Sequence, residues 1–189
     1  MGFINYPRHF FLLGCGAIVL VCLARLPISL GYDRSWCLFG LSGALHATAM
    51  ALALRSSPPW WSRLAFVAAA AVLGITALVT GLGAVDLLGL RGITTLFVAL
   101  ALIAAIGAAS YWLLIRARWA RSLSFRSLLA TVGSCVSATI LASLATGVMP
   151  LLRDALLPTF WWLAFSASLL IADRHNAAPN DAPKWTWRF

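Results

Sequence analysis

The sequence contains no glutamate, and charged residues of any kind make up only 10% of its 189 residues. About 25% is usual for soluble domains. All five acidic residues are aspartates, and none of them lies inside the long apolar runs described below. Proton-coupled transporters normally relay protons through carboxylates at membrane depth. The absence of such carboxylates argues against a transporter of that kind.

Several catalytic signatures are also missing. The chain has four cysteines but no CxxC pair, the arrangement that thiol-oxidising membrane enzymes require. It has no glycine-rich phosphate-binding loop and no metal-hydrolase motif. We therefore expect no cofactor and no metal, and we favour a protein without enzymatic activity.

Apolar residues, in contrast, are abundant: 62% of the chain is hydrophobic, against roughly 45 to 50% in soluble domains. Inside a bilayer every backbone N–H and C=O needs a partner within the protein, which leaves helices or a closed barrel. The apolar runs are continuous rather than alternating, and each has about the 17 to 25 residues that a membrane-crossing helix needs. We therefore predict an all-α integral membrane protein, a bundle of six transmembrane helices with short loops, at residues 10–30, 36–54, 64–83, 93–115, 128–149 and 155–172.

The basic residues predict the orientation of these helices, because Lys and Arg in short loops are retained on the cytoplasmic side. Three of the fourteen, Arg34, Arg91 and Arg153, fall in the loops on one side of the predicted membrane. Ten fall on the other side: Arg8, Arg55, Arg63, Arg116, Arg118, Arg121, Arg126, Arg174, Lys184 and Arg188. This split predicts an N-in/C-in, multi-pass protein of a bacterial inner membrane, and it accounts for the net charge of +9 without nucleic-acid binding.

The predicted organisation has three parts. Residues 1–9 form a cytoplasmic N-terminus, residues 10–172 the six-helix transmembrane domain, and residues 173–189 a cytoplasmic tail rich in basic and aromatic side chains. Within the domain, small residues recur about every four positions, a spacing that lets membrane helices approach closely. Two such stripes predict packing faces: Ala70, Gly74, Ala77 and Gly81 in the third run, and Ala130, Ser134, Ala138, Ala142 and Thr146 in the fifth.

Two ionisable residues, Arg25 and His46, lie within the predicted spans. A charge at bilayer depth costs about 2.5 to 3.5 kcal/mol on insertion scales, so residues of this kind often mark a site. We take both as candidate binding residues. Arg25 is close enough to the outer end of its span to reach the surface or to pair with Asp33, and a hydrogen bond from His46 to a neighbouring carbonyl is the structural alternative.

One short segment points to an enzyme class. Gly40-Leu41-Ser42-Gly43, followed by His46, resembles the GxSG segment of rhomboid-type intramembrane serine proteases. The resemblance covers about seven residues and implies Ser42 as the nucleophile, with His46 as a second catalytic candidate four residues later on the same helix face. The family takes its general base from a later helix, where this sequence has no histidine before His175, and it places the serine on its fourth core helix rather than its second.

Taken together, these patterns favour a non-catalytic membrane protein that acts through other proteins. The expected partners are the lipid bilayer and either another membrane protein or further copies of the same chain. An accessory subunit, an assembly subunit and an immunity protein all fit this description. The alternative is a small-solute transporter or the substrate-binding component of a larger one, for which six short-looped helices suffice. A rhomboid-like protease is the third hypothesis.

Overall fold

The computed structural model describes residues 4–25, 33–55, 58–89, 92–119, 123–146 and 153–177. Over these residues the chain forms six α-helices and no β-strand. They are α1 (Tyr6–Arg25), α2 (Asp33–Ala53), α3 (Trp60–Leu87), α4 (Ile93–Arg118), α5 (Phe125–Thr146) and α6 (Arg153–Ala177). The predicted all-α class is confirmed.

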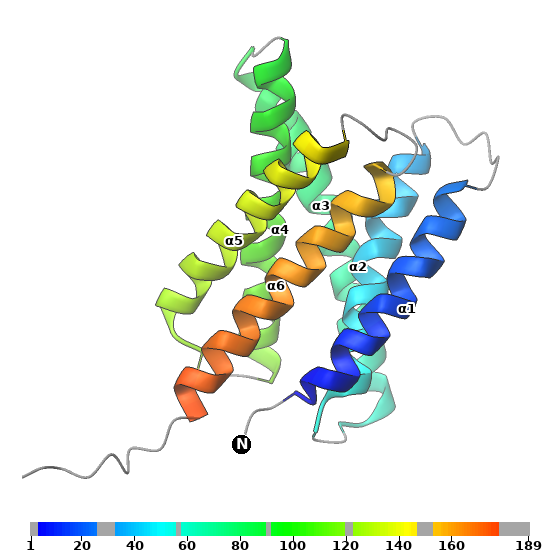
Figure 1. Ribbon diagram of the computed structural model, residues 1–189, viewed down its shortest axis with the longest axis vertical. Coiled ribbons are helices and arrows are strands. Elements are labelled where there is room, and N and C mark those ends of the chain that lie inside the picture. Colours follow the sequence, from blue (N-terminus) through cyan, green and yellow to red (C-terminus); the bar gives the residue numbers. More distant parts are fainter. Residues whose placement is uncertain are drawn as a thin grey trace, which may run out of the picture.

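Each helix packs against the next in the chain, and α6 returns to contact both α1 and α2. The helices therefore form a closed bundle, with α6 lying between α5 and α1 (Figure 1). The start of α1 and the end of α6 lie at the same end of the bundle (Figure 1).

Five of these helices are long and apolar enough to cross a membrane, namely α1, α3, α4, α5 and α6. The apolar part of α2 is shorter, Cys37–Ala53, because this helix begins with the charged pair Asp33 and Arg34. Many large hydrophobic side chains face outward, such as Leu113, Leu129 and Ile171. In lipid such an outer surface is stable, because hydrocarbon is its solvent. The chain is therefore a helical protein of the multi-pass membrane type.

Helix α1 begins four residues before the apolar run predicted for it. Asn5 precedes the first turn, and its Oδ1 accepts a hydrogen bond from the Arg8 N–H at 3.4 Å, the usual role of an N-cap side chain. Pro7 fits there because the N–H groups of a first turn have no partner within the helix. The Asn5 N–H donates to the Ala53 carbonyl at 2.8 Å. This early start places His9 inside the helix.

The other helices cover their predicted runs with small differences at the ends. Pro59 is the N-cap of α3, and Gly89 and Gly92 adopt positive φ angles of 61° and 81° in the turn before α4. Helix α6 continues to Ala177, five residues past the predicted span and into the predicted tail. Residues 26–30, 147–149 and 178–189, which belong to the predicted first span, fifth span and tail, lie outside the described residues.

Glycines bring α2 and α3 into close contact. A Cβ atom on Gly43 would lie 2.5 Å from the Ala70 carbonyl oxygen, and one on Gly74 would lie 2.9 Å from the Phe39 carbonyl oxygen. Real Cβ atoms do not approach other atoms so closely, so only glycine fits at these positions. The predicted packing face of the third run is confirmed at Ala70, which is 1% exposed. Gly40 also contacts α3, at the Ile75 side chain. Both glycines of the GxSG segment therefore have a packing role.

The packing face of α5 differs from the prediction. Thr131, Cys135 and Ala142 are buried, whereas Ala130 and Ser134 face outward. The prediction is therefore confirmed at Ala142 and wrong at Ala130 and Ser134. The small-residue spacing identified that α5 has a face of small side chains, but two such faces lie about one residue apart around the helix, and spacing alone does not choose between them.

Candidate functional site: a central cavity above a buried histidine pair

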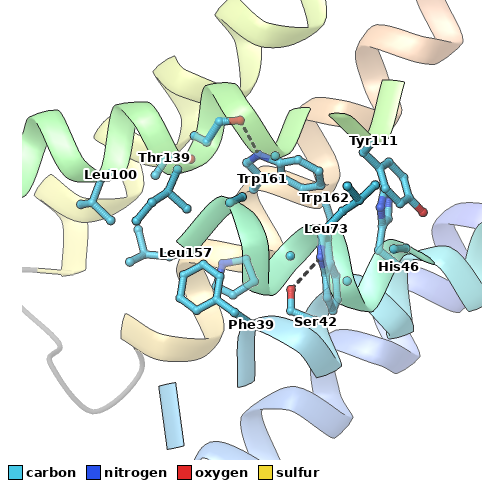
Figure 2. Close-up of a pocket in the computed structure, with 18 residues that line it drawn as sticks. Phe39, Ser42, His46, Leu73, Leu100, Tyr111, Thr139, Leu157, Trp161 and Trp162 are labelled. Atoms are coloured by element: carbon cyan, nitrogen blue, oxygen red, sulfur yellow. Dashed lines mark hydrogen bonds between the residues drawn. The ribbon is translucent and has the colours of Figure 1, made fainter. Parts of the chain in front are cut away.

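A cavity of about 90 Å³ lies in the middle of the bundle. One water molecule needs about 10 to 15 Å³ on this measure, so the space fits several waters or one small organic molecule. Helices α2, α3, α4, α5 and α6 all line it (Figure 2). Most of its eighteen lining residues are apolar or aromatic. Apart from the indole N–H groups of two tryptophans, the polar groups come from four residues: Ser42, His46, Tyr111 and Thr139.

Two tryptophans of α6 form one wall of this cavity and tie it to neighbouring helices. The Trp162 indole N–H donates to Ser42 Oγ of α2 at 3.1 Å, and the Trp161 N–H donates to the Ala104 carbonyl of α4 at 3.3 Å. Figure 2 shows both bonds as dashed lines. Trp162 is 1% exposed. Buried indoles usually need such a partner, so the two bonds fix the position of α6 beside the cavity.

The polar groups of the cavity differ in what they can still bind. The Thr139 hydroxyl donates to the Cys135 carbonyl of its own helix at 2.8 Å, the common arrangement for threonine in a membrane helix. Ser42 Oγ accepts the bond from Trp162 and keeps its own proton and a further lone pair. The Tyr111 hydroxyl makes no hydrogen bond among the described residues. Ser42 and Tyr111 are therefore the lining residues whose hydroxyls can still both donate and accept a hydrogen bond.

His46 lies at the boundary between the cavity and a buried polar cluster. Its Nε2 is 3.2 Å from Ser166 Oγ, and the Nε2 of His9 is 2.9 Å from the same oxygen. All three residues are 0% exposed, and the two imidazole centroids are 5.7 Å apart. One hydroxyl of α6 thus joins a histidine of α1 to a histidine of α2.

Aromatic rings surround His46 on its other sides. The Trp162 ring is stacked on the imidazole at a centroid distance of 6.0 Å and an interplanar angle of 8°. The Tyr111 ring lies 5.0 Å away, and the Phe165 ring meets the imidazole edge-on at 5.5 Å. The Nδ1 atom of His46 has no hydrogen-bond partner among the described residues, so it is a buried polar atom whose bonding capacity is unused. The His9 ring lies next to the Ala49 backbone of α2, although its Nδ1 makes no hydrogen bond of good geometry there.

The predicted site residues are only partly brought together. Ser42 and His46 both line the cavity, but they are not hydrogen-bonded to each other: Ser42 bonds to Trp162 and His46 bonds to Ser166. A serine nucleophile needs a base within hydrogen-bond reach, and in the described residues the neighbour of Ser42 Oγ is an indole donor. Arg25 is the last residue of α1, and its side chain lies outside the described residues.

Two members of the buried cluster were not identified from the sequence. His9 was placed in the cytoplasmic N-terminus, because the predicted apolar run began after it. The pair Asn5 and Pro7 was a usable signal of an earlier helix start. Ser166 is one of two serines between Phe160 and Leu170 of α6 and gave no signal of its own.

The described residues contain no group of three or more His, Cys, Asp or Glu side chains placed to hold a metal ion. Cys15, Cys22 and Cys37 are exposed, and Cys135 is buried. No protein-family model, curated protein or solved structure matches this chain.

Proposed function

We propose that this protein binds a small, neutral and mostly apolar solute in its central cavity, as a carrier or as the solute-binding component of a larger transporter. The cavity is the observation that supports this proposal. Ligand sites in proteins are typically apolar concavities with a few well-placed polar groups, and they are often found between the helices of a bundle. The Ser42 hydroxyl provides such a polar group, and among the described residues no Lys, Arg or Asp lines the cavity.

Binding is tested with indole and toluene as probes on the detergent-solubilised protein, with the melting temperature as the readout. Indole should raise the melting temperature of the wild type. Ala104→Leu fills the cavity, because Ala104 lines it and is 3% exposed, and it should abolish that rise. Ala167→Leu is the matched control, because Ala167 faces outward on α6.

Gly107→Ala is a milder filling variant, since its new Cβ would meet Ala77 and Trp161 at 3.7 Å, an ordinary contact distance. It should weaken the response to indole without disturbing the fold. If neither probe raises the melting temperature of the wild type, or if Ala104→Leu responds as strongly as Ala167→Leu, the proposed solute site is wrong.

The proposed membrane arrangement has six spans, namely the five long apolar helices and the shorter α2. It has both termini on the cytoplasmic side (N-in/C-in) of a bacterial inner membrane. The distribution of basic residues supports it, and so does the common position of the start of α1 and the end of α6 (Figure 1). Reporters fused after Arg126 and after Phe189 should report cytoplasm, and one fused at Gly89 should report the opposite side. A periplasmic signal at Phe189 would contradict the six-span arrangement.

A second candidate function is that of a non-catalytic accessory, assembly or immunity subunit that acts through a protein partner. The outer face of α5 favours it, because Ala130, Gly133 and Ser134 are exposed there and small side chains let another membrane helix approach closely. Co-purification in mild detergent tests this role. Gly133→Leu should release a bound partner and Gly83→Leu should not, since a Cβ at either glycine meets nothing within 4 Å in the bundle.

A further inference from the structure

We propose that His46, Ser166 and His9 form a proton relay between the central cavity and the end of the bundle where α1 begins. The relay itself rests on the geometry of these three residues. Its coupling to a solute rests on the function proposed above. His46 lines the cavity, and His9 lies three residues after the first residue of α1, about 4.5 Å along the helix axis. The Ser166 hydroxyl, which is hydrogen-bonded to both imidazoles, connects His46 to His9.

The number of protons in this cluster determines its hydrogen-bond pattern. A serine hydroxyl has one proton to donate, and a neutral imidazole has one N–H donor and one bare nitrogen acceptor. With both Nε2 atoms on Ser166 Oγ, a satisfied neutral cluster has one histidine donating to the oxygen and the other accepting its proton. The two histidines are then opposite tautomers. One Nδ1 is a bare acceptor and the other carries a proton.

This pattern allows a proton to cross the cluster without any net change in charge. A proton from water in the cavity binds the bare Nδ1 of His46, and the resulting imidazolium passes its Nε2 proton to Ser166 Oγ. The Ser166 proton moves to Nε2 of His9, and His9 releases its own Nδ1 proton on the far side. One proton enters, one leaves, and no electrons are transferred. Rotation of the hydroxyl and exchange of the tautomers restore the starting state.

The surroundings of the two histidines suit a transient charge. The rings packed around His46 are Tyr111 of α4 and Trp161, Trp162 and Phe165 of α6. The titratable groups that face it are Tyr111 and, from α1, His9. An excess proton is therefore not held there by a carboxylate. It is passed on instead, which is the behaviour that a relay needs.

The exit from His9 leads toward the end of the bundle. The ring of His9 contacts Phe10 of its own helix and lies near the backbone of Ala49 in α2. One turn earlier in α1, the Tyr6 hydroxyl lies beside Asp173 of α6, with Arg174 also nearby. Asp173 is half-exposed. Asp173 is the acidic group that the structure places beside Tyr6, one turn from His9, and the relay takes its carboxylate as the acceptor at this end of the bundle.

Proton conduction is tested on the full chain in liposomes that contain a pH-sensitive dye, with a potassium gradient and valinomycin to drive protons inward. Wild-type liposomes should acidify faster than empty ones. Ser166→Ala should reduce the rate to that of empty liposomes, because it removes the hydroxyl that connects the two imidazoles. Ser168→Ala should keep the wild-type rate, because its hydroxyl donates only to the Ala164 carbonyl at 2.9 Å.

His9→Gln separates conduction from folding. A glutamine side chain can retain a hydrogen bond to Ser166 Oγ, but it does not accept a proton near neutral pH. The variant should melt close to the wild-type temperature, respond to indole like the wild type, and conduct no protons. A merely structural His9 would leave conduction unchanged. Wild-type conduction in His9→Gln or in Ser166→Ala overturns the relay.

The two proposals fail in different ways. If the wild type is stabilised by indole but conducts no protons, the relay is wrong and the solute site stands. If it conducts protons but binds neither indole nor toluene, the solute site is wrong and the relay stands without its coupling.

Discussion

Helix α2 makes two junctions, and they are held together differently. Toward α1 and α6, side-chain hydrogen bonds join the helices: Ser166 Oγ bonds to both His9 and His46, and Trp162 bonds to Ser42. These bonds hold polar groups at membrane depth, where such groups are costly and commonly functional.

Toward α3, the helices are held by close approach of their backbones at Gly43 and Gly74. Membrane helices associate both through packing of small residues and through interhelical hydrogen bonds. In this protein the two kinds of contact lie on neighbouring faces of α2, and Gly43 and His46 both line the cavity. The central cavity borders both junctions, because Gly43 and Gly74 line it together with Ser42 and Trp162. The polar groups differ: Ser42, Ser166 and His46, whose Nδ1 has no partner among the described residues, belong to the α1–α2–α6 junction, so the proposed proton relay lies there.

The largest predicted loss of stability is at the α2–α3 contact formed by Gly43 and Gly74, which we call the glycine junction. In Gly43→Val the Cβ alone would lie 2.5 Å from the Ala70 carbonyl oxygen, so α2 and α3 must separate. We expect a loss of about 3 kcal/mol in the free energy of unfolding, measured by denaturant titration in detergent. Gly83→Val is the control, because its Cβ position is open. Equal stability of the two variants would show that the junction does not depend on glycine.

A smaller effect is expected at the hydrogen-bonded junction. Ser166→Ala leaves the Nε2 atoms of His9 and His46 without their shared partner. Interhelical hydrogen bonds in membranes contribute about 0.6 kcal/mol each on average and up to about 1.7, so the loss should be about 1 to 2 kcal/mol in the same titration. The variant should therefore remain folded. A loss as large as that of Gly43→Val would mean that the polar junction carries as much of the stability as the glycine junction.

Ser42→Ala removes a single bond, the one that Ser42 accepts from Trp162. We expect a loss of about 0.6 kcal/mol and a weaker response to indole, since the cavity loses a hydroxyl. A double-mutant cycle with Trp162→Phe should recover that coupling energy. The same variant tests the protease hypothesis: proteolytic activity in the wild type that disappears in Ser42→Ala, with stability nearly unchanged, would establish Ser42 as a nucleophile.

The smallest effect should come from Thr139→Val. The Thr139 hydroxyl donates to the Cys135 carbonyl of its own helix, so it connects no two helices. We expect the free energy of unfolding to change by no more than about 0.5 kcal/mol. The rise in melting temperature on adding indole should be close to that of the wild type. A loss above that of Ser42→Ala would place Thr139 among the residues that hold the bundle together.

The sequence predicted the helices well because hydrophobic length is a local property. The predicted third and fourth runs lie within α3 and α4, and the fourth starts at the same residue as its helix. The start of α1 was missed, since the predicted apolar run begins at Phe10, after Arg8 and His9, whereas the helix begins where Asn5 caps it. That difference of four residues moved His9 from the predicted N-terminus into the core.

The candidate site was predicted in part for a similar reason. Ser42 and His46 were placed on one helix face from their spacing, and both line the cavity. Their partners, Trp162 and Ser166, are 120 residues away in the chain, and helical periodicity does not specify which distant helix faces which. A serine on an apolar helix is compatible with many roles until its neighbours are known.

The amino-acid sequence by itself determined that this chain is a bundle of apolar helices, because backbone hydrogen bonding and the length of apolar runs act within each segment. Only the tertiary structure decided that α6 returns between α5 and α1. That return brings Ser166 between two histidines from different helices and closes a cavity beside them. The reason is physical: the choice among helix faces depends on the simultaneous fit of glycines, indoles and hydroxyls from several segments, and no single segment contains that information.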